Sequence, residues 1–149
     1  MYTMTCGILL LGNSPEIKKV AQFTAAMQDV LNNEKISRIL FENNNHNKFT
    51  QIARNLIPKS TSLELVSCYA PHIDYSVLYT EYDQIHNIPP ESSHTSVHHA
   101  LFTVRKFVID NSDIVIYNSA FPSPMQERIQ KYLSRKKGKI LIDIARQKL

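Results

Sequence analysis

The sequence predicts an α/β protein, a doubly wound three-layer sandwich around a mostly parallel, five-stranded sheet. Apolar runs of strand length alternate with segments of helical periodicity, which is the pattern of βαβ units. The first of these runs, residues 7–11, is continuously apolar, as expected of a strand that is covered on both faces. Right-handed crossovers between such strands place helices on both sides of the sheet. The 149 residues suffice for one domain, residues 1–149, and are too few for two ordinary ones.

The expected elements follow in chain order. Strands are predicted near 7–11, 36–41, 63–68, 113–117 and 139–144. The first helix should begin after Ser14, a good N-cap, with Pro15 at its first position. Its inward stripe is expected to hold Ile17, Val20, Thr24, Met27 and Leu31. Further helices are expected at 49–56, 92–111 and 124–136, and the long irregular segment 69–91 favours a lid or binding loop.

Composition and cysteine usage indicate an ordinary globular chain. Hydrophobic residues make up 43% and charged residues 20%, and no apolar run approaches the roughly 20 residues that span a bilayer. The N-terminus lacks the positive flank of a signal peptide, so we expect a cytoplasmic protein without membrane contact. Cys6 and Cys68 fall in apolar, strand-like segments, which favours reduced thiols that behave as small buried hydrophobes.

The positive charge is concentrated near the C-terminus. The net charge is +4, and the segment from Arg128 to Lys148 holds eight basic residues against one acidic residue. Its centre, 135–139, coincides with the expected end of a helix, where cations suit the helix dipole and Gly138 marks the stop. We favour a solvated helix end over a nucleic-acid or phosphate surface, and do not expect a nucleic-acid partner.

The first candidate ligand site is the turn that follows the first strand. Gly12, Asn13 and Ser14 lie between a strand and a helix, a geometry whose free backbone amides can hold a phosphate. The chain has only three glycines, so a dinucleotide fingerprint is absent. The alternative is that this turn only caps the helix.

The second candidate lies at the end of the 113–117 strand. Asn118 and Ser119 can hydrogen-bond a ribose or a base, and Arg105 can offer its planar fork to a phosphate or carboxylate. The alternative for Arg105 is a salt bridge to Asp110 or Asp113 that ties the helix to the strand. Both interpretations remain open at this stage.

The stretch from Arg105 to Tyr117 follows a loop with Tyr82, Pro89 and Pro90. It resembles a motif of YpsA-like proteins of the SLOG superfamily, in which Arg-Asn is followed by Val-Asp-x-Ser-Asp and then by Ile-Ala. The resemblance implies a Rossmann-like fold that binds nucleotides or nucleotide-derived ligands at the first and fourth strand ends. Residues 42–46 and 119–122 replace the family's glycine-rich segments, and Lys106 replaces the asparagine after the motif arginine. Residues with a Cβ cannot approach a pyrophosphate as glycine can, so either the ligand differs from that of the relatives or binding is lost.

Three functional hypotheses follow. The first is a sensor or regulatory module for a nucleotide-like small molecule, with the ligand contacted by Gly12, Asn13, Ser14, Asn43, Tyr69, Arg105, Asn118 and Ser119. The second is an N-glycosidic hydrolase or transferase acting on a nucleoside phosphate, with Glu42 or Asp74 as a weak candidate for the catalytic carboxylate. The third is a degenerate scaffold that acts through protein contacts.

Three histidines and two phenylalanines of the expected 92–111 helix bear on metal binding and on assembly. His94 and His98 have the i, i+4 spacing of a metal site, with His99 beside them, but no further ligand completes a set, so we expect no metal and no cofactor. Phe102 and Phe107 lie off the inward stripe of the 92–111 helix, which favours a homodimer or higher homo-oligomer.

Overall fold

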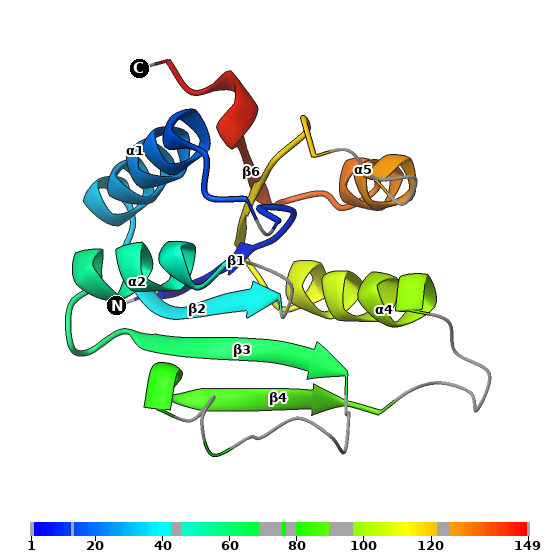
Figure 1. Cartoon of the computed structure of the whole chain (residues 1–149), viewed down its shortest axis with the longest axis horizontal. Coiled ribbons are helices and arrows are strands. Elements are labelled where there is room, and N and C mark those ends of the chain that lie inside the picture. Colours follow the sequence, from blue (N-terminus) through cyan, green and yellow to red (C-terminus); the bar gives the residue numbers. More distant parts are fainter. Residues whose placement is uncertain are drawn as a thin grey trace.

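The computed structural model describes residues 2–12, 14–42, 46–68, 76, 80–89, 97–121 and 126–148. Within these residues the chain forms one sheet of six strands: β1 (Met4–Ile8), β2 (Ile36–Glu42), β3 (Ser62–Cys68), β4 (Gln84–Ile88), β5 (Ile114–Tyr117) and β6 (Ile140–Asp143). The strand order is β4-β3-β2-β1-β5-β6, and every neighbouring pair is parallel (Figure 1). The order therefore reverses at β1.

Four helices of the described chain cover the two faces of this sheet (Figure 1). Helix α1 (Ile17–Asn33) contacts α2 (Asn47–Leu56), while α4 (Val97–Asp110) contacts α5 (Gln126–Ser134). A single turn of 3₁₀ helix, η1 (Ile144–Arg146), follows β6 and contacts α1. None of the described helices combines the length and apolarity needed to cross a membrane.

The core consists of two apolar clusters, one on each face of the sheet. Alternate residues of one strand point to opposite faces, so Ile39 and Phe41 of β2 join the cluster under α1 and α2, whereas Leu40 joins the cluster under α4 and α5. The ring of Phe23 in α1 lies edge-on to Phe41 of β2, with centroids 6.2 Å apart, and to Phe49 of α2, with centroids 5.4 Å apart. This alternation explains why the inner strands need apolar residues for both faces of the sheet.

The predicted α/β class and the parallel sheet are confirmed, but the predicted number of strands is wrong. The sheet has six strands, because Gln84–Ile88 lies within the segment expected to be a loop and pairs with β3 as an edge strand. Its sequence, Gln-Ile-His-Asn-Ile, has only two apolar residues among three polar ones and stays partly exposed. An edge strand needs no continuous apolar run, so the pattern used for the inner strands does not detect it.

The start of the chain also differs from the prediction. Strand β1 ends at Ile8 because Leu10 adopts a left-handed conformation with φ +66°, although Leu9, Leu10 and Leu11 all stay fully buried. Helix α1 begins at Ile17 after Glu16, whose side chain makes no capping hydrogen bond. Ile17 is 91% exposed rather than inward, because the buried face of α1 begins later in the helix.

The apolar residues that suggested an oligomer are contacted within the chain. Phe102 lies edge-on to Tyr132 at 6.4 Å, and Phe107 lies 5.8 Å from the ring of His86. Both phenylalanines pack against the cluster under α4 and α5. Homo-oligomerisation stays a prediction. Phe102 and Phe107 do not support it, because both rings have partners within the chain.

Candidate functional site at the strand-order reversal

The reversal of strand order at β1 creates the position where open parallel sheets bind ligands. The connections from β1 and β5 leave toward opposite faces, so the carboxyl ends of these two strands border a crevice. Helix α1 starts directly after the turn that follows β1, and the loop 118–121 follows β5. The sequence-based prediction placed the ligand at this edge of the sheet.

A cavity of about 260 Å³ lies here. We call it the switch-point cavity, and it is lined by Glu16, Lys18, Lys19, Gln22, Asn118, Ala120, Phe121 and Ala145. Two other hollows, of about 320 and 330 Å³, share Arg54 of α2. The guanidinium of Arg54 already pairs with Asp83 and donates to the carbonyl oxygen of Glu81, and Lys59 is the other cation in the lining of the larger hollow.

Two lysines occupy the first turn of α1, at the edge of the switch-point cavity. The Lys19 ammonium donates to the carbonyl oxygens of Leu11 and Ser14, at 2.9 and 3.0 Å, and so holds the turn against the helix. Lys18 is exposed and has no partner among the described residues. Cations are disfavoured at a helix N-terminus, where the backbone amides already carry positive charge. An anion bound in the cavity would offset both charges.

Gln22 lies one turn further along α1 and is only 8% exposed. Its carboxamide makes no hydrogen bond to any described residue, although it lines the cavity. A buried amide without a partner is unusual and costs about 1–3 kcal/mol. Asn118, 6% exposed, lies on the opposite wall, and its side-chain oxygen accepts a hydrogen bond from the Ala120 amide at 3.1 Å. The cavity thus presents amide groups suited to hydroxyls or ring nitrogens.

Phe121 separates the switch-point cavity from the turn at Gly12. Gly12 has φ +80°, and a Cβ placed on it would lie 2.5 Å from Cε2 of Phe121. The ring therefore covers the glycine at the place where a phosphate-binding turn would leave its backbone open. Gly12 and Ser14 do not line the cavity. The carbonyl oxygen of Ser14 accepts a hydrogen bond from Lys19, which does line it.

Behind Phe121, Arg105 forms a buried ion pair with Glu42. The Arg105 Nε donates to Glu42 Oε2 at 2.6 Å, and both side chains are 1% exposed. Glu42 Oε1 accepts a hydrogen bond from the backbone amide of Leu10 at 2.7 Å. The Arg105 guanidinium also faces the ring of Phe121, 5.9 Å from its centroid. These contacts join α4, the end of β2 and the turn after β1.

Arg105 forms a salt bridge, as one of the two interpretations predicted, but its partner is Glu42 and not Asp110 or Asp113. Asp113 accepts hydrogen bonds from the Thr5 amide and the Tyr2 hydroxyl, while Asp110 pairs with Lys136 and accepts from Tyr132. Neither aspartate holds Arg105. The hydrogen bonds that Glu42 accepts on both carboxylate oxygens leave it no free oxygen directed at a substrate.

Among the other predicted site residues, Asn118 lines the switch-point cavity, and the backbone amide of Ser119 next to it donates to Asp143 Oδ1 at 3.0 Å. Asn13, Asn43, Tyr69, Asp74 and His94 lie outside the described residues, as do the side chains of His98 and His99. In the described part of the chain, no three His, Cys, Asp or Glu side chains gather as a metal site.

The sequence analysis missed the α1 side of the cavity, which consists of Glu16, Lys18, Lys19 and Gln22. A sequence signal for it exists. Two adjacent lysines in the first turn of a helix oppose the helix dipole, and Glu16 directly before that turn is the acidic residue beside them.

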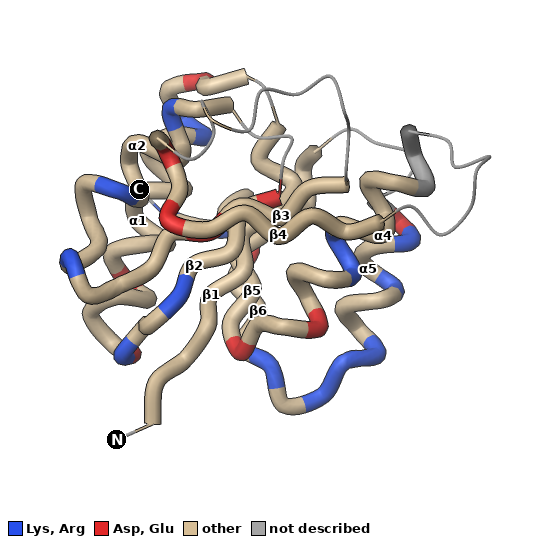
Figure 2. The backbone as a smooth tube through the Cα atoms, turned by 90° about the horizontal axis from the view of Figure 1, so that it is seen from below, with Lys and Arg blue, Asp and Glu red and all other residues tan. Residues whose placement is uncertain are grey.

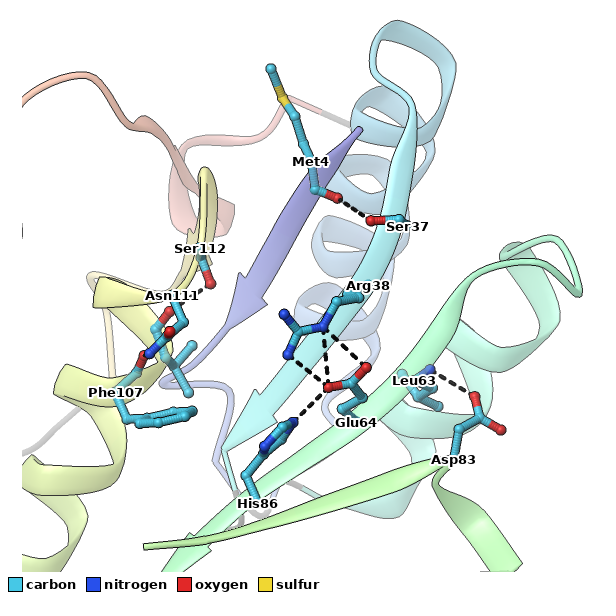
Figure 3. Close-up of polar contacts among 11 residues, drawn as sticks. Met4, Ser37, Arg38, Leu63, Glu64, Asp83, His86, Phe107, Asn111 and Ser112 are labelled. Atoms are coloured by element: carbon cyan, nitrogen blue, oxygen red, sulfur yellow. Dashed lines mark hydrogen bonds and ion pairs between the residues drawn. The ribbon is translucent and has the colours of Figure 1, made fainter. Parts of the chain in front are cut away.

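A second polar cluster crosses β2, β3 and β4 far from the cavity. Figure 3 shows Arg38 and His86 pointing toward Glu64 from the two neighbouring strands. Glu64 is 2% exposed and accepts from Arg38 Nη2 at 2.9 Å and contacts His86 Nε2 at 2.6 Å. Burial alone would raise the pKa of Glu64, but hydrogen bonds from Arg38, His86 and Ser62 outweigh it and lower the pKa to about 2. This carboxylate therefore stays ionised and ties three strands together.

Comparison of the chain with models of known protein families gives no match, and comparison with curated proteins gives none either. The resemblance of residues 105–117 to YpsA-like proteins therefore stays a prediction from the sequence.

Proposed function

We propose that this chain binds a nucleotide or nucleotide-derived molecule in the switch-point cavity and acts as a sensor or regulatory module with a Rossmann-like fold. The observation that carries the proposal is Gln22, a buried carboxamide without a described partner in a cavity at the strand-order reversal. A ligand hydroxyl or ring nitrogen would satisfy it. Lys18 and the first amides of α1 would take the phosphate.

The size of the cavity favours a small ligand. Sites for drug-sized molecules usually enclose about 300–1,000 Å³, and the switch-point cavity has about 260 Å³. A ribose phosphate or a mononucleotide with part of its base outside fits this volume better than a dinucleotide does. The buried, doubly hydrogen-bonded state of Glu42 supports a binding role over glycosidic cleavage at that residue.

Calorimetry with a panel of nucleoside monophosphates, diphosphates and ADP-ribose would test the proposal. Gln22→Ala should weaken the best ligand about three- to tenfold, as expected for a neutral hydrogen bond, and Lys18→Gln should weaken it at least about tenfold. Lys48→Gln is the matched control, because Lys48 is an exposed lysine at the start of α2 and outside the cavity. Saturating ligand should also raise the melting temperature of the wild type.

Two results would contradict the proposal. One is the absence of any stabilisation by the panel at millimolar concentrations. The other is a bound nucleotide whose affinity is unchanged by both Gln22→Ala and Lys18→Gln. Release of free base during incubation, detected by chromatography, would instead indicate an enzyme that cleaves or transfers N-glycosidic bonds.

A further inference from the structure

Another hollow, of about 230 Å³, lies on the opposite side of the sheet from α1, between α4 and α5. We call it the α5 hollow, and it is lined by Phe102, Arg128, Lys131, Tyr132 and Arg135. Arg128, Lys131 and Tyr132 follow the spacing i, i+3 and i+4 and share one face of α5, and Arg135 directly follows the end of the helix. Phe102 of α4 completes the wall, with its ring edge-on to Tyr132.

The three cations of the α5 hollow have no carboxylate partner among the described residues. Asp110 is the acidic residue that contacts the wall, and both of its oxygens accept the Tyr132 hydroxyl, at 2.6 and 2.8 Å. Asp110 also pairs with Lys136 at 3.1 Å. The guanidinium of Arg128 lies 4.3 Å from the centroid of Phe102 and makes no ion pair with a described residue. Three like charges in so small a space repel one another unless an anion lies between them.

The neighbouring cations distinguish a compact anion from a long polyanion. Figure 2 shows basic residues along α5 and the loop that follows it. Two of those outside the hollow bind oxygen acceptors: Lys136 pairs with Asp110, and Lys139 donates to the carbonyl oxygen of Ser112 at 2.6 Å. Lys106 contacts the same Phe102 ring as Arg128 does and so adds to the charge around the hollow. The uncompensated charge is therefore concentrated in the hollow rather than spread along a track, as a polynucleotide would require.

We propose that the α5 hollow is a binding site for a phosphate monoester whose organic group is aromatic or apolar. The two arginine forks and Lys131 would bind the dianionic phosphate, since guanidinium groups match phosphate oxygens in pairs. The organic group would lie beside the half-buried rings of Phe102 and Tyr132, which also contact Arg128, Lys106 and Lys136. The same chemistry is present in a small phosphate ester and in a phosphorylated protein segment. This site is separate from the switch-point cavity and does not depend on the function proposed there.

Two-dimensional NMR of the full chain with phenyl phosphate would locate the site, and calorimetry would measure its affinity. Amide shifts should concentrate at residues 128–135 and around Phe102. The triple variant R128Q/K131Q/R135Q should bind phenyl phosphate at least about a hundredfold more weakly, because each lost charge-assisted hydrogen bond costs about tenfold or more. Its matched control is K48Q/K59Q/K148Q, which removes the same charge from exposed lysines elsewhere and should bind as the wild type does.

Further arms identify the ligand chemistry and guard against misfolding. Affinity should rise from about pH 5 to pH 7 as the phosphate gains its second charge, while phenyl sulfate should bind weakly at both values. The single variants K131Q and R135Q, whose side chains make no ring contact, report on the site if the triple variant unfolds. A phosphotyrosine peptide that binds more tightly than phenyl phosphate would identify a protein segment as the source, and equal affinity would identify a small ester.

Three results would overturn the proposal. Phenyl phosphate at millimolar concentration could leave residues 128–135 unperturbed. The triple variant and its control could weaken binding equally, which would show a response to net charge alone. A short oligonucleotide or an acidic peptide without phosphate could bind more tightly than phenyl phosphate and displace it, which would assign the surface to a polyanion.

Discussion

Replacing Glu42 by glutamine should be among the most destabilising single changes in this chain. The change keeps the size of the side chain and an oxygen for the Leu10 amide, but it removes the negative charge 2.6 Å from Arg105 Nε. The guanidinium would then be left buried at 1% exposure without a counter-charge. Breaking a buried pair in this way costs about 3–5 kcal/mol.

Two companion variants separate the contributions of the charge and of the hydrogen bond. Glu42→Ala also deprives the buried amide of Leu10 of its acceptor, which should cost about 1–3 kcal/mol more than Glu42→Gln does. The double variant Glu42→Met with Arg105→Met removes both charges and fills the space with apolar side chains. It should recover much of the loss, because buried pairs are often replaceable by apolar residues of similar volume.

Urea unfolding followed by circular dichroism would measure these differences. A domain of this size has about 5–15 kcal/mol of stability, so Glu42→Gln should still fold in the more stable part of that range. A loss of about 3–5 kcal/mol corresponds to a fall in melting temperature of about 6–20 °C. The reasoning would be refuted if Glu42→Gln stayed within about 1 kcal/mol of the wild type. It would also be refuted if the double methionine variant lost as much stability as Glu42→Met and Arg105→Met lose separately, added together.

Three further predictions concern other parts of the chain. Because the folded pKa of Glu64 is about 2, its stabilisation, at most about 3 kcal/mol, should be present above about pH 4.5 and be lost toward pH 2. Acid titration of unfolding should show a flatter curve for Glu64→Gln; parallel curves would contradict this. Burial raises the pKa of Cys6 to about 12 and, less strongly, that of Cys68, so a thiol reagent should modify Cys68 first and Cys6 only on unfolding; equal rates would contradict it. Gly12→Ala should destabilise the fold by about 1–3 kcal/mol, and Phe121→Ala in the same chain should relieve the steric part; additive losses would exclude the clash.

The inner strands could be predicted because burial on both faces makes their sequences rich in apolar residues, with polar positions such as Arg38 and Glu64 in the minority. Strand β4 could not, since its Ile85 and Ile88 lie among polar residues at an edge of the sheet. The end of β1 was misplaced for a related reason. Leu9, Leu10 and Leu11 are as buried as a strand would be, and only the left-handed Leu10 shows that the chain has already turned.

The candidate site was predicted on one side and missed on the other. Asn118 was found because a polar residue directly after a buried strand marks the carboxyl edge of the sheet. The partner of Arg105 was not found, because Glu42 is 63 positions away in the sequence while two aspartates lie within eight. Proximity along the chain favoured Asp110 and Asp113, and only the crossing of α4 over the end of β2 brings Glu42 to the arginine.

Because glycine is scarce, a ligand at the strand-order reversal would be recognised by side chains and by the first backbone amides of α1 rather than by a glycine-rich turn. The chain has three glycines, and each has a structural use. Gly7 admits side chains from the end of α4 at a distance that a Cβ would forbid, Gly12 lies under an aromatic ring, and Gly138, with φ +80°, forms the turn before β6. None remains to bring bare backbone against a phosphate. Under the proposed function, the charge of Lys18 and the carboxamide of Gln22 then do what a glycine-rich turn does elsewhere, and the ligand should be one that needs few backbone contacts.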